Sequence, residues 1–141
     1  MFLISHRGNL NGVESENENS PNYIKNAISH GFHVEIDVWD VAGTYYLGHD
    51  DPQHIVNKEF LSNNRLWCHA KNIDALHHML KDGIHCFWHQ SDDVAITSKG
   101  FIWTYPGKNL TNKSIAIFLG PPEDDFDKNI SGICSDYIQQ F

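Results

Sequence analysis

The sequence predicts an α/β fold: a (β/α)8 TIM-type barrel in which several outer helices are shortened or missing. Two observations favour this class. Strand-like apolar segments alternate with amphipathic helical segments, as is typical of a parallel sheet. The strand-like segments number eight, which is the number that closes such a barrel. Because 141 residues are fewer than the roughly 200 at the lower limit for this fold, an open sheet is the structural alternative.

Each predicted strand is a short apolar run bounded by turn-forming or polar residues. The last four strands are joined by links of about a dozen residues or fewer, which is barely enough for a parallel crossover. The eight predicted strands cover residues 2–5, 33–39, 45–48, 66–71, 85–89, 101–105, 115–119 and 133–138.

Three helices are predicted from their capping residues. Ser20 is a suitable N-cap with Pro21 in the first helical position, and Gly31 ends that helix. A second helix is expected over 51–61, beginning at an Asp-Pro pair. A third is expected over 72–83, with asparagine as its N-cap and glycine as its stop.

Residues 1–141 are expected to form one domain, because the chain shows no linker or repeat and is long enough to bury a core. The net charge of −8 argues against a nucleic-acid-binding surface, which would need a basic face. No signal-peptide core precedes His6 and no apolar run reaches membrane-spanning length, so a cytoplasmic protein without a membrane segment is expected. Cys68, Cys86 and Cys134 show no paired spacing and are expected to be reduced and buried.

Glu35 and Asp37 are two residues apart in a predicted strand, so their side chains share one face, about 7 Å apart along the chain. Two like charges on a buried face are costly unless a cation or a basic partner neutralises them. The alternative is an exposed polar face. In a parallel barrel both faces are covered, and the pair is then a candidate metal site.

Two short motifs directly follow predicted strands, where barrel strands deliver catalytic residues. His6-Arg7-Gly8 offers an acid–base group, a guanidinium fork for phosphate and a close backbone approach. His49-Asp50 offers a second histidine. Each motif is weak alone, and together they indicate a site at one end of the sheet.

His69 and Lys71 also share a strand face. Their spacing leaves two alternatives open. They can face the core as a metal ligand and a phosphate contact, or they can face solvent while Cys68 and Ala70 pack inside. Spacing alone favours the solvent-facing alternative.

The order of these motifs resembles the glycerophosphodiester phosphodiesterase family, within the PLC-like phosphodiesterase barrels. Residues 27–31 also match the end of that family's first helix, and residues 134–136 resemble the Thr-Asp of its last strand. The match is clear over residues 2–51 and partial beyond residue 66, and the chain would be an unusually short member. The motifs are His6-Arg7-Gly8, Glu18-Asn19-Ser20, Glu35-Ile36-Asp37-Val38 and Gly48-His49-Asp50.

The resemblance implies a role for each matching residue. His6 and His49 would be the acid–base pair, Glu35 and Asp37 metal ligands, and Arg7 a phosphate contact. In this family a hydroxyl of the substrate itself often attacks phosphorus. One histidine then accepts its proton and the other protonates the leaving alcohol.

One position departs from the family. Where the fourth strand usually carries Glu-x-Lys, this chain has His69-Ala70-Lys71. The aligned Lys71 supports the register as a substrate contact, which favours His69 as the third metal ligand. Glu18 would lie at the edge of the site, as a ligand or an anchor behind one. Mg²⁺ is the first expectation for the divalent ion, with Mn²⁺, Zn²⁺ or Ca²⁺ as alternatives, although an imidazole weakens the case for Ca²⁺.

The leading functional hypothesis is a metal-dependent enzyme that hydrolyses a small glycerophosphodiester-like phosphodiester. The alternative is a catalytically silent barrel that binds a phosphorylated ligand or has a structural role. A hydrolase or lyase acting on another ester is a third possibility. Sparse helical cover would expose apolar barrel wall, so a homo-oligomer is also considered.

Overall fold

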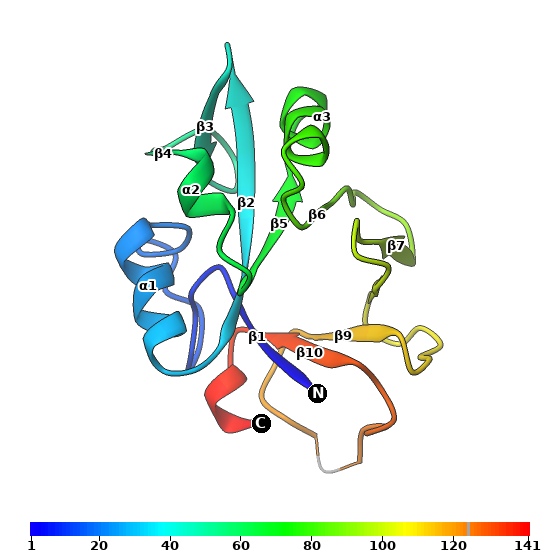
Figure 1. The fold of residues 1–141 in the computed structure, drawn as a ribbon. Coiled ribbons are helices and arrows are strands. Elements are labelled where there is room, and N and C mark those ends of the chain that lie inside the picture. The colour runs from blue at the N-terminus through cyan, green and yellow to red at the C-terminus, as the bar shows by residue number, and fades with distance from the viewer. Residues whose placement is uncertain (124) are drawn as a thin grey trace.

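Strand β1 (Phe2–His6) lies inside the sheet, parallel to β2 (His33–Val41) on one side and to β10 (Gly132–Ser135) on the other. Figure 1 shows this arrangement in the computed structural model, which describes residues 1–123 and 125–141. The parallel order continues in both directions. Beyond β10 it includes β9 (Ser114–Phe118) and β8 (Ile102–Thr104), and beyond β2 it includes β5 (Leu66–Ala70) and β6 (Cys86–Phe87).

Three further strands pair in antiparallel fashion. β3 (Thr44–Leu47) folds back on the end of β2, and β4 (His54–Val56) pairs with β3. β7 (Val94–Ile96) forms a hairpin with β8. The sheet is therefore mixed, with ten strands among the described residues.

The prediction of a (β/α)8 barrel is wrong. The described residues form a mostly sheet domain with three short α-helices: α1 (Pro21–Ser29), α2 (Lys58–Leu61) and α3 (Ile73–Lys81). α1 and α3 pack against β2, and α3 also packs against β5 and β6 (Figure 1). Between β6 and β9 the links are too short to hold crossover helices, and β7 and β8 form a hairpin there.

The connection after β2 explains much of the error. Ala42 and Gly43 both have positive φ, 52° and 84°, and form the tight two-residue turn of a β-hairpin. The third predicted strand therefore runs antiparallel to the second. The helix predicted over 51–61 is also largely wrong, because His54–Val56 pairs with β3 and the helix begins only after Asn57.

Local capping signals are confirmed at the other two helices. The Ser20 hydroxyl accepts a hydrogen bond from the amide of Tyr23 at the start of α1, with Pro21 in the first turn. Asn72 accepts the amide hydrogen bond of Ala75 at the start of α3. A short 3₁₀ turn, η1 (Ile138–Gln140), replaces the end of the last predicted strand.

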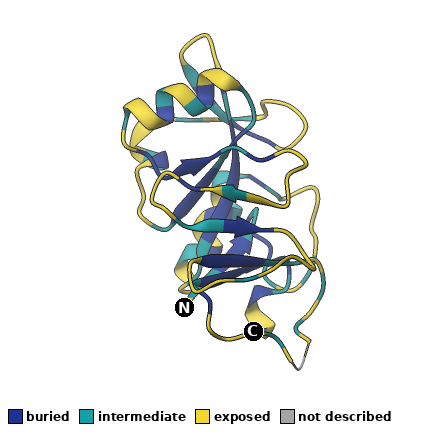
Figure 2. Cartoon of the chain, turned by 90° about the vertical axis from the view of Figure 1, so that its right-hand side faces the viewer, coloured by how far each residue is buried: buried dark blue, intermediate teal, exposed yellow. Residues whose placement is uncertain are grey.

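The two faces of the sheet have separate cores. Alternate β2 residues, including Val34 and Ile36, are buried under α1 and α3 with Ile24 and Met79. Figure 2 shows most of the central strands buried and the outer helix surfaces exposed. The three cysteines are free and buried, as predicted. No helix of the described chain is long and apolar enough to cross a membrane.

Aromatic side chains fill the inner face of the parallel strands. Trp67 of β5 packs against Trp103 of β8 with 6.2 Å between ring centroids, and Phe87 of β6 lies 4.7 Å from the same ring. These contacts join two distant branches of the sheet, so the sheet is strongly curved. The curvature leaves polar side chains together at the carboxyl ends.

Candidate functional site

The candidate site lies where the carboxyl ends of β1, β5 and β10 meet the first half of β2. His6 ends β1, Glu35 and Asp37 lie on β2, His69 lies on β5, and Asp136 directly follows β10. In sheets with parallel strands this edge is where ligands bind. The register confirms that Glu35 and Asp37 share one face, because Val34 and Ile36 are buried on the opposite side.

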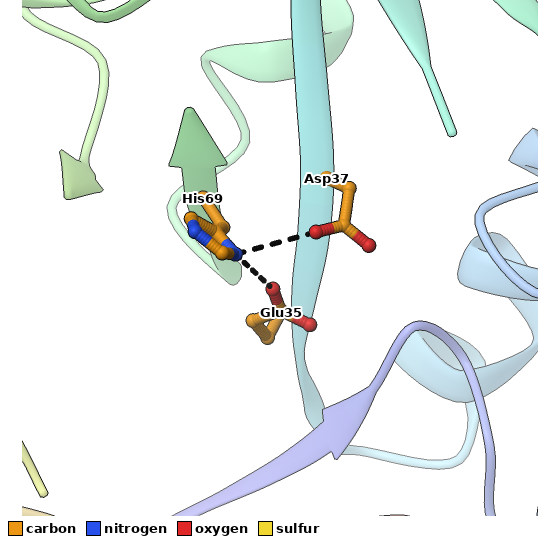
Figure 3. A group of neighbouring side chains, drawn as sticks. All are labelled: Glu35, Asp37 and His69. Atoms are coloured by element: carbon orange, nitrogen blue, oxygen red, sulfur yellow. Dashed lines mark ion pairs between the residues drawn. The ribbon is translucent and has the colours of Figure 1, made fainter. Parts of the chain in front are cut away.

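Glu35, Asp37 and His69 surround a common point (Figure 3). One ligand atom from each lies within 4.8 Å of the others. The His69 Nδ1 atom is 3.7 Å from Glu35 Oε1 and 3.3 Å from Asp37 Oδ1. His69 thus faces the site rather than solvent, while its neighbours Cys68 and Ala70 are buried under α3. The solvent-facing alternative for His69 is wrong.

The orientation of His69 is fixed from behind. Its Nε2 atom is 2.9 Å from the carbonyl oxygen of His89, and its ring stacks on Phe87. Because a carbonyl only accepts, Nε2 carries a proton. Burial lowers the pKa of His69, but the contacts of Nδ1 with Asp37 and the charge of Glu35 outweigh burial and raise this pKa. A cation bound at this point would replace the proton on Nδ1. A metal-ligating histidine is held in the same way, through its second nitrogen.

Asp37 has hydrogen-bond or ion-pair contacts with Asn19, Arg7 and His69. Its Oδ2 atom accepts a hydrogen bond of 2.9 Å from the Asn19 amide, and the Asn19 side-chain oxygen accepts the Asp37 backbone N–H. Arg7 forms an ion pair with the same oxygen, and its Nε atom lies 3.0 Å from Asp37 Oδ2. Burial raises the pKa of Asp37, but the contacts with His69, Arg7 and Asn19 outweigh burial and lower this pKa to about 2. The carboxylate is therefore charged at neutral pH.

Two carboxylate oxygens in the site are buried without a hydrogen-bond partner among the described residues: Glu35 Oε2 and Asp37 Oδ1. The nearest cation to Asp37 Oδ1 beyond His69 is the Lys71 ammonium, at 3.9 Å. Burial and the neighbouring charge of Asp37 raise the pKa of Glu35. An unpartnered buried carboxylate is costly, and a divalent cation bound by the carboxylates of Glu35 and Asp37 and by His69 Nδ1 would neutralise both charges. The residues fit such an ion.

His6 is held by Asp136, which the sequence predicts as part of the last strand's motif but not as a site residue. His6 Nδ1 donates a 2.8 Å hydrogen bond to Asp136 Oδ1, and Asn9 donates a second bond of 2.8 Å to the same oxygen. His6 Nε2 faces the metal group, 3.8 Å from Glu35 Oε2. Burial lowers the pKa of His6, but the hydrogen bond to Asp136 and the charge of Glu35 outweigh it and raise this pKa.

Arg7 reaches the site because the chain turns sharply after β1. Its φ of 56° is left-handed, and Gly8 follows at 98°. A Cβ on Gly8 would lie 2.5 Å from the Tyr23 ring, so the turn requires glycine. The Arg7 guanidinium also donates a 3.2 Å hydrogen bond to Glu18. Glu18 therefore anchors Arg7 at the edge of the site.

His49 lies at the mouth of the site, on the turn after β3. Gly48 begins this turn, where its N–H donates to the Asp37 carbonyl and its own carbonyl accepts from the Trp39 indole. The His49 side chain is 44% exposed and hydrogen-bonded to Asp50. Two neighbouring cavities, of about 320 and 240 Å³, share His6, Arg7 and His49 in their walls.

The structure thus brings seven of the eight predicted site residues to the walls of these cavities or into the metal group. Lys71 is the eighth, and its link to the site is the distance of 3.9 Å between its Nζ atom and Asp37 Oδ1. Sequence reasoning missed Asp136 and Asn9 as site residues, and it used Asn19 only as part of a motif. Asp136 had a usable signal, since a polar residue that directly follows a predicted parallel strand lies at the ligand edge.

Comparisons with known proteins do not identify a family. No protein-family model matches the chain, and no curated protein or solved structure matches it either.

Proposed function

We propose that this protein is a metal-dependent phosphodiesterase that hydrolyses a small, glycerophosphodiester-like phosphodiester. The observation that carries the proposal is the convergence of Glu35, Asp37 and His69 on one point, beside His6 and Arg7. The ordered motifs that resemble glycerophosphodiester phosphodiesterases support the same activity. Membership of that family is part of the proposal.

Glu35, Asp37 and His69 would hold the ion. Two carboxylates and one imidazole suit Mg²⁺, Mn²⁺ or Zn²⁺ better than Ca²⁺, which prefers oxygen ligands alone. A bound divalent ion would supply positive charge beside the phosphoryl oxygens of the substrate. This matters in a protein of net charge −8, because an anionic substrate needs local positive charge.

Arg7 and Lys71 add positive charge from the protein itself. Both are near Asp37, at 3.0 and 3.9 Å, and their side chains are largely buried, so they are held beside the ion site. Arg7 also lines both cavities. We assign the phosphate contact to these two residues, since a guanidinium and an ammonium both bind phosphate oxygens.

His6 and His49 would carry the protons. With Nδ1 bonded to Asp136, neutral His6 presents an unprotonated Nε2 to the cavity. A hydroxyl of the substrate, or water, attacks phosphorus while one histidine accepts its proton. The bond from phosphorus to the leaving alcohol breaks, and the other histidine donates the proton that this alcohol needs.

The test is turnover of bis(p-nitrophenyl) phosphate with Mg²⁺ or Mn²⁺ after removal of bound metal. His6→Ala and His49→Ala should each reduce the rate by about 10²-fold or more. The matched control is His77→Ala, since His77 is exposed on α3. Metal binding without turnover of any phosphodiester in a panel would instead favour a ligand-binding protein without catalysis.

The assignment of His69 needs a separate test. In His69→Glu the site gains the third carboxylate typical of the resembling family, so its preference should move toward Mg²⁺ and Ca²⁺ and away from Zn²⁺. Elemental analysis of protein purified without chelator or nickel resin measures the bound metal. An unchanged metal preference in the variant would exclude His69 as a ligand.

A further inference from the structure

The site has two unlike sides that meet at His6, Arg7 and His49. These three residues belong to the walls of both cavities. A phosphodiester also has two sides, because its phosphorus joins two ester groups. If the phosphate lies at the shared residues, then each cavity takes one ester group.

The larger cavity, of about 320 Å³, is polar. Apart from the shared residues, its wall is built mostly from carboxylate, amide and hydroxyl side chains that can bond a hydroxylated group. These are Ser15, Glu18, Asn19, Asp50, Gln53 and Asp136.

The smaller cavity, of about 240 Å³, is lined by Glu35 and His69 of the metal group and by five uncharged, largely apolar side chains. These five are Trp103 on β8 and Tyr105 directly after it, Ile117 on β9 and Leu119 directly after it, and Cys134 on β10. None of these five side chains is charged. We call this group the apolar wall.

Two contacts of His89 leave few free polar atoms beside the apolar wall. His89, which also lines the cavity, stacks flat on Tyr105 with 4.2 Å between ring centroids. Its Nε2 atom is 2.6 Å from the Asp92 carbonyl, so this nitrogen is already bonded. Leu119 remains 72% exposed and Tyr105 41% exposed, although both border the cavity. An apolar ligand group would cover this exposed surface.

We propose that the substrate is a phosphodiester with one polar and one compact apolar ester group, and that the apolar group packs against the apolar wall. This inference rests on the proposed phosphodiesterase activity. A single aromatic ring or a short alkyl chain has the right size, since a cavity of about 150 Å³ is enough to hold benzene. Each buried methylene is worth about fourfold in binding. A glycerol hydroxyl facing the wall would lose its partners, which costs about tenfold or more.

A matched pair of substrates tests the wall. Benzyl glyceryl phosphate and diglyceryl phosphate share one ester group and differ in the other, and both leaving groups are alkyl alcohols. The metal-loaded protein should show at least tenfold higher kcat/KM for the benzyl compound. A hexyl analogue should behave like the benzyl compound if any compact apolar group suffices, and poorly if the wall selects a ring.

One substitution tests whether the apolar wall causes the preference for the benzyl compound. Leu119→Gln places a polar side chain of similar length there and should lower the benzyl-to-diglyceryl ratio at least threefold. Because Leu119 is exposed, this change should not prevent folding. Ile96→Gln is the matched control, since Ile96 on β7 is equally exposed at 73% and lies outside the cavity. Its ratio should equal that of the wild type.

The outcomes separate this inference from the proposed function. Turnover of both compounds at equal rates, or a ratio unaffected by Leu119→Gln, would overturn the apolar wall and leave the phosphodiesterase intact. If neither compound is hydrolysed, the proposed function fails and calorimetric binding of the same pair decides. Tighter binding of the benzyl compound would support the wall, and equal binding would overturn it.

Discussion

The carboxylate of Asp136 accepts a 2.8 Å hydrogen bond from His6 Nδ1, although the two residues are 130 positions apart in the chain. The pairing of β1 with β10 makes this contact possible, because Ser5 lies opposite Ser135 and each strand then delivers its next residue to the same edge. Asp136 is therefore a positioning residue for His6. It fixes which imidazole nitrogen faces the metal group.

Asp136→Asn should reduce phosphodiester turnover by about 10²-fold with little change in metal affinity. An amide can donate to His6 Nδ1 and reverse the tautomer, which removes the unprotonated Nε2 from the cavity. Nitrogen-15 NMR of the His6 ring reports the tautomer directly. Asp74→Asn makes the same charge change at an exposed position on α3 and should keep wild-type turnover. An unchanged His6 tautomer in Asp136→Asn would contradict this role.

Glu35→Gln should raise stability in chelator and abolish stabilisation by metal. Glu35 Oε2 is buried without a hydrogen-bond partner among the described residues, so removing the charge should raise the melting temperature by a few degrees, or about 1 kcal/mol. Metal at about 100 times its Kd should stabilise the wild type by about 2.7 kcal/mol. Calorimetric melting with and without Mn²⁺ measures both effects.

The control for this comparison is Glu59→Gln, at an exposed position on α2. It should melt like the wild type in both conditions. Equal metal-induced shifts in Glu35→Gln and in the wild type would place the bound ion elsewhere.

The elements that the sequence predicted correctly have local causes. Ser20 and Asn72 cap α1 and α3 through bonds within three residues, so the information lies in adjacent positions. The direction of a strand has no such local signature, because alternation is the same in parallel and antiparallel pairs. The turn at Ala42 and Gly43 therefore decides that β3 runs antiparallel to β2. A longer parallel connection at this point is what the predicted barrel would have required.

The site divides in the same way. The shared face of Glu35 and Asp37 follows from strand periodicity and was predictable. The choice of face for His69 depended on α3 covering the opposite side of β5, which periodicity cannot reveal. The contact of His6 with Asp136 needs the first and last strands to pair. A closed barrel implies that pairing, but no local pattern shows that Asp136 would reach His6.

His85 should make the fold less stable below pH 6.5. Burial, assisted by Lys99 and His33, lowers the pKa of His85 to about 4. The unfolded chain therefore takes up this proton near pH 6.5 and the folded chain only near pH 4, so stability is full above pH 6.5 and falls as the pH decreases. The expected loss is about 2 kcal/mol at pH 5, measured by urea unfolding at pH 7.5 and pH 5.

His85→Gln tests the assignment of this loss. Glutamine stays neutral and can still hydrogen-bond to the Thr97 hydroxyl, the present partner of His85 Nε2 at 2.9 Å. The difference in stability between pH 7.5 and pH 5 should be smaller in the variant by about the same 2 kcal/mol. Burial also lowers the pKa of His33, which should account for part of the remaining slope. Parallel stability curves for the two proteins would contradict the role of His85.

Gly48→Ala should lower turnover because it displaces the backbone of the turn that carries His49. Gly43→Ala is the matched control. Both glycines have positive φ, 154° and 84°, so alanine is strained at each. At Gly43 a Cβ would meet no atom within 4 Å, and the cost should be about 1–2 kcal/mol with turnover unchanged. At Gly48 a Cβ would lie 2.0 Å from the Asp51 carbonyl oxygen. The turn that carries His49 must then move.

A shift of about 1 Å in a catalytic group costs about 10²-fold in rate, so Gly48→Ala should lose turnover as well as roughly 3 kcal/mol of stability. Urea unfolding and kcat on bis(p-nitrophenyl) phosphate measure the two losses separately. If His49 has no part in catalysis, Gly48→Ala will lose stability while a folded sample keeps its wild-type kcat. The Gly43 variant excludes the simpler explanation that any strained turn near β3 lowers the rate, because it strains the opposite end of the same strand without moving His49.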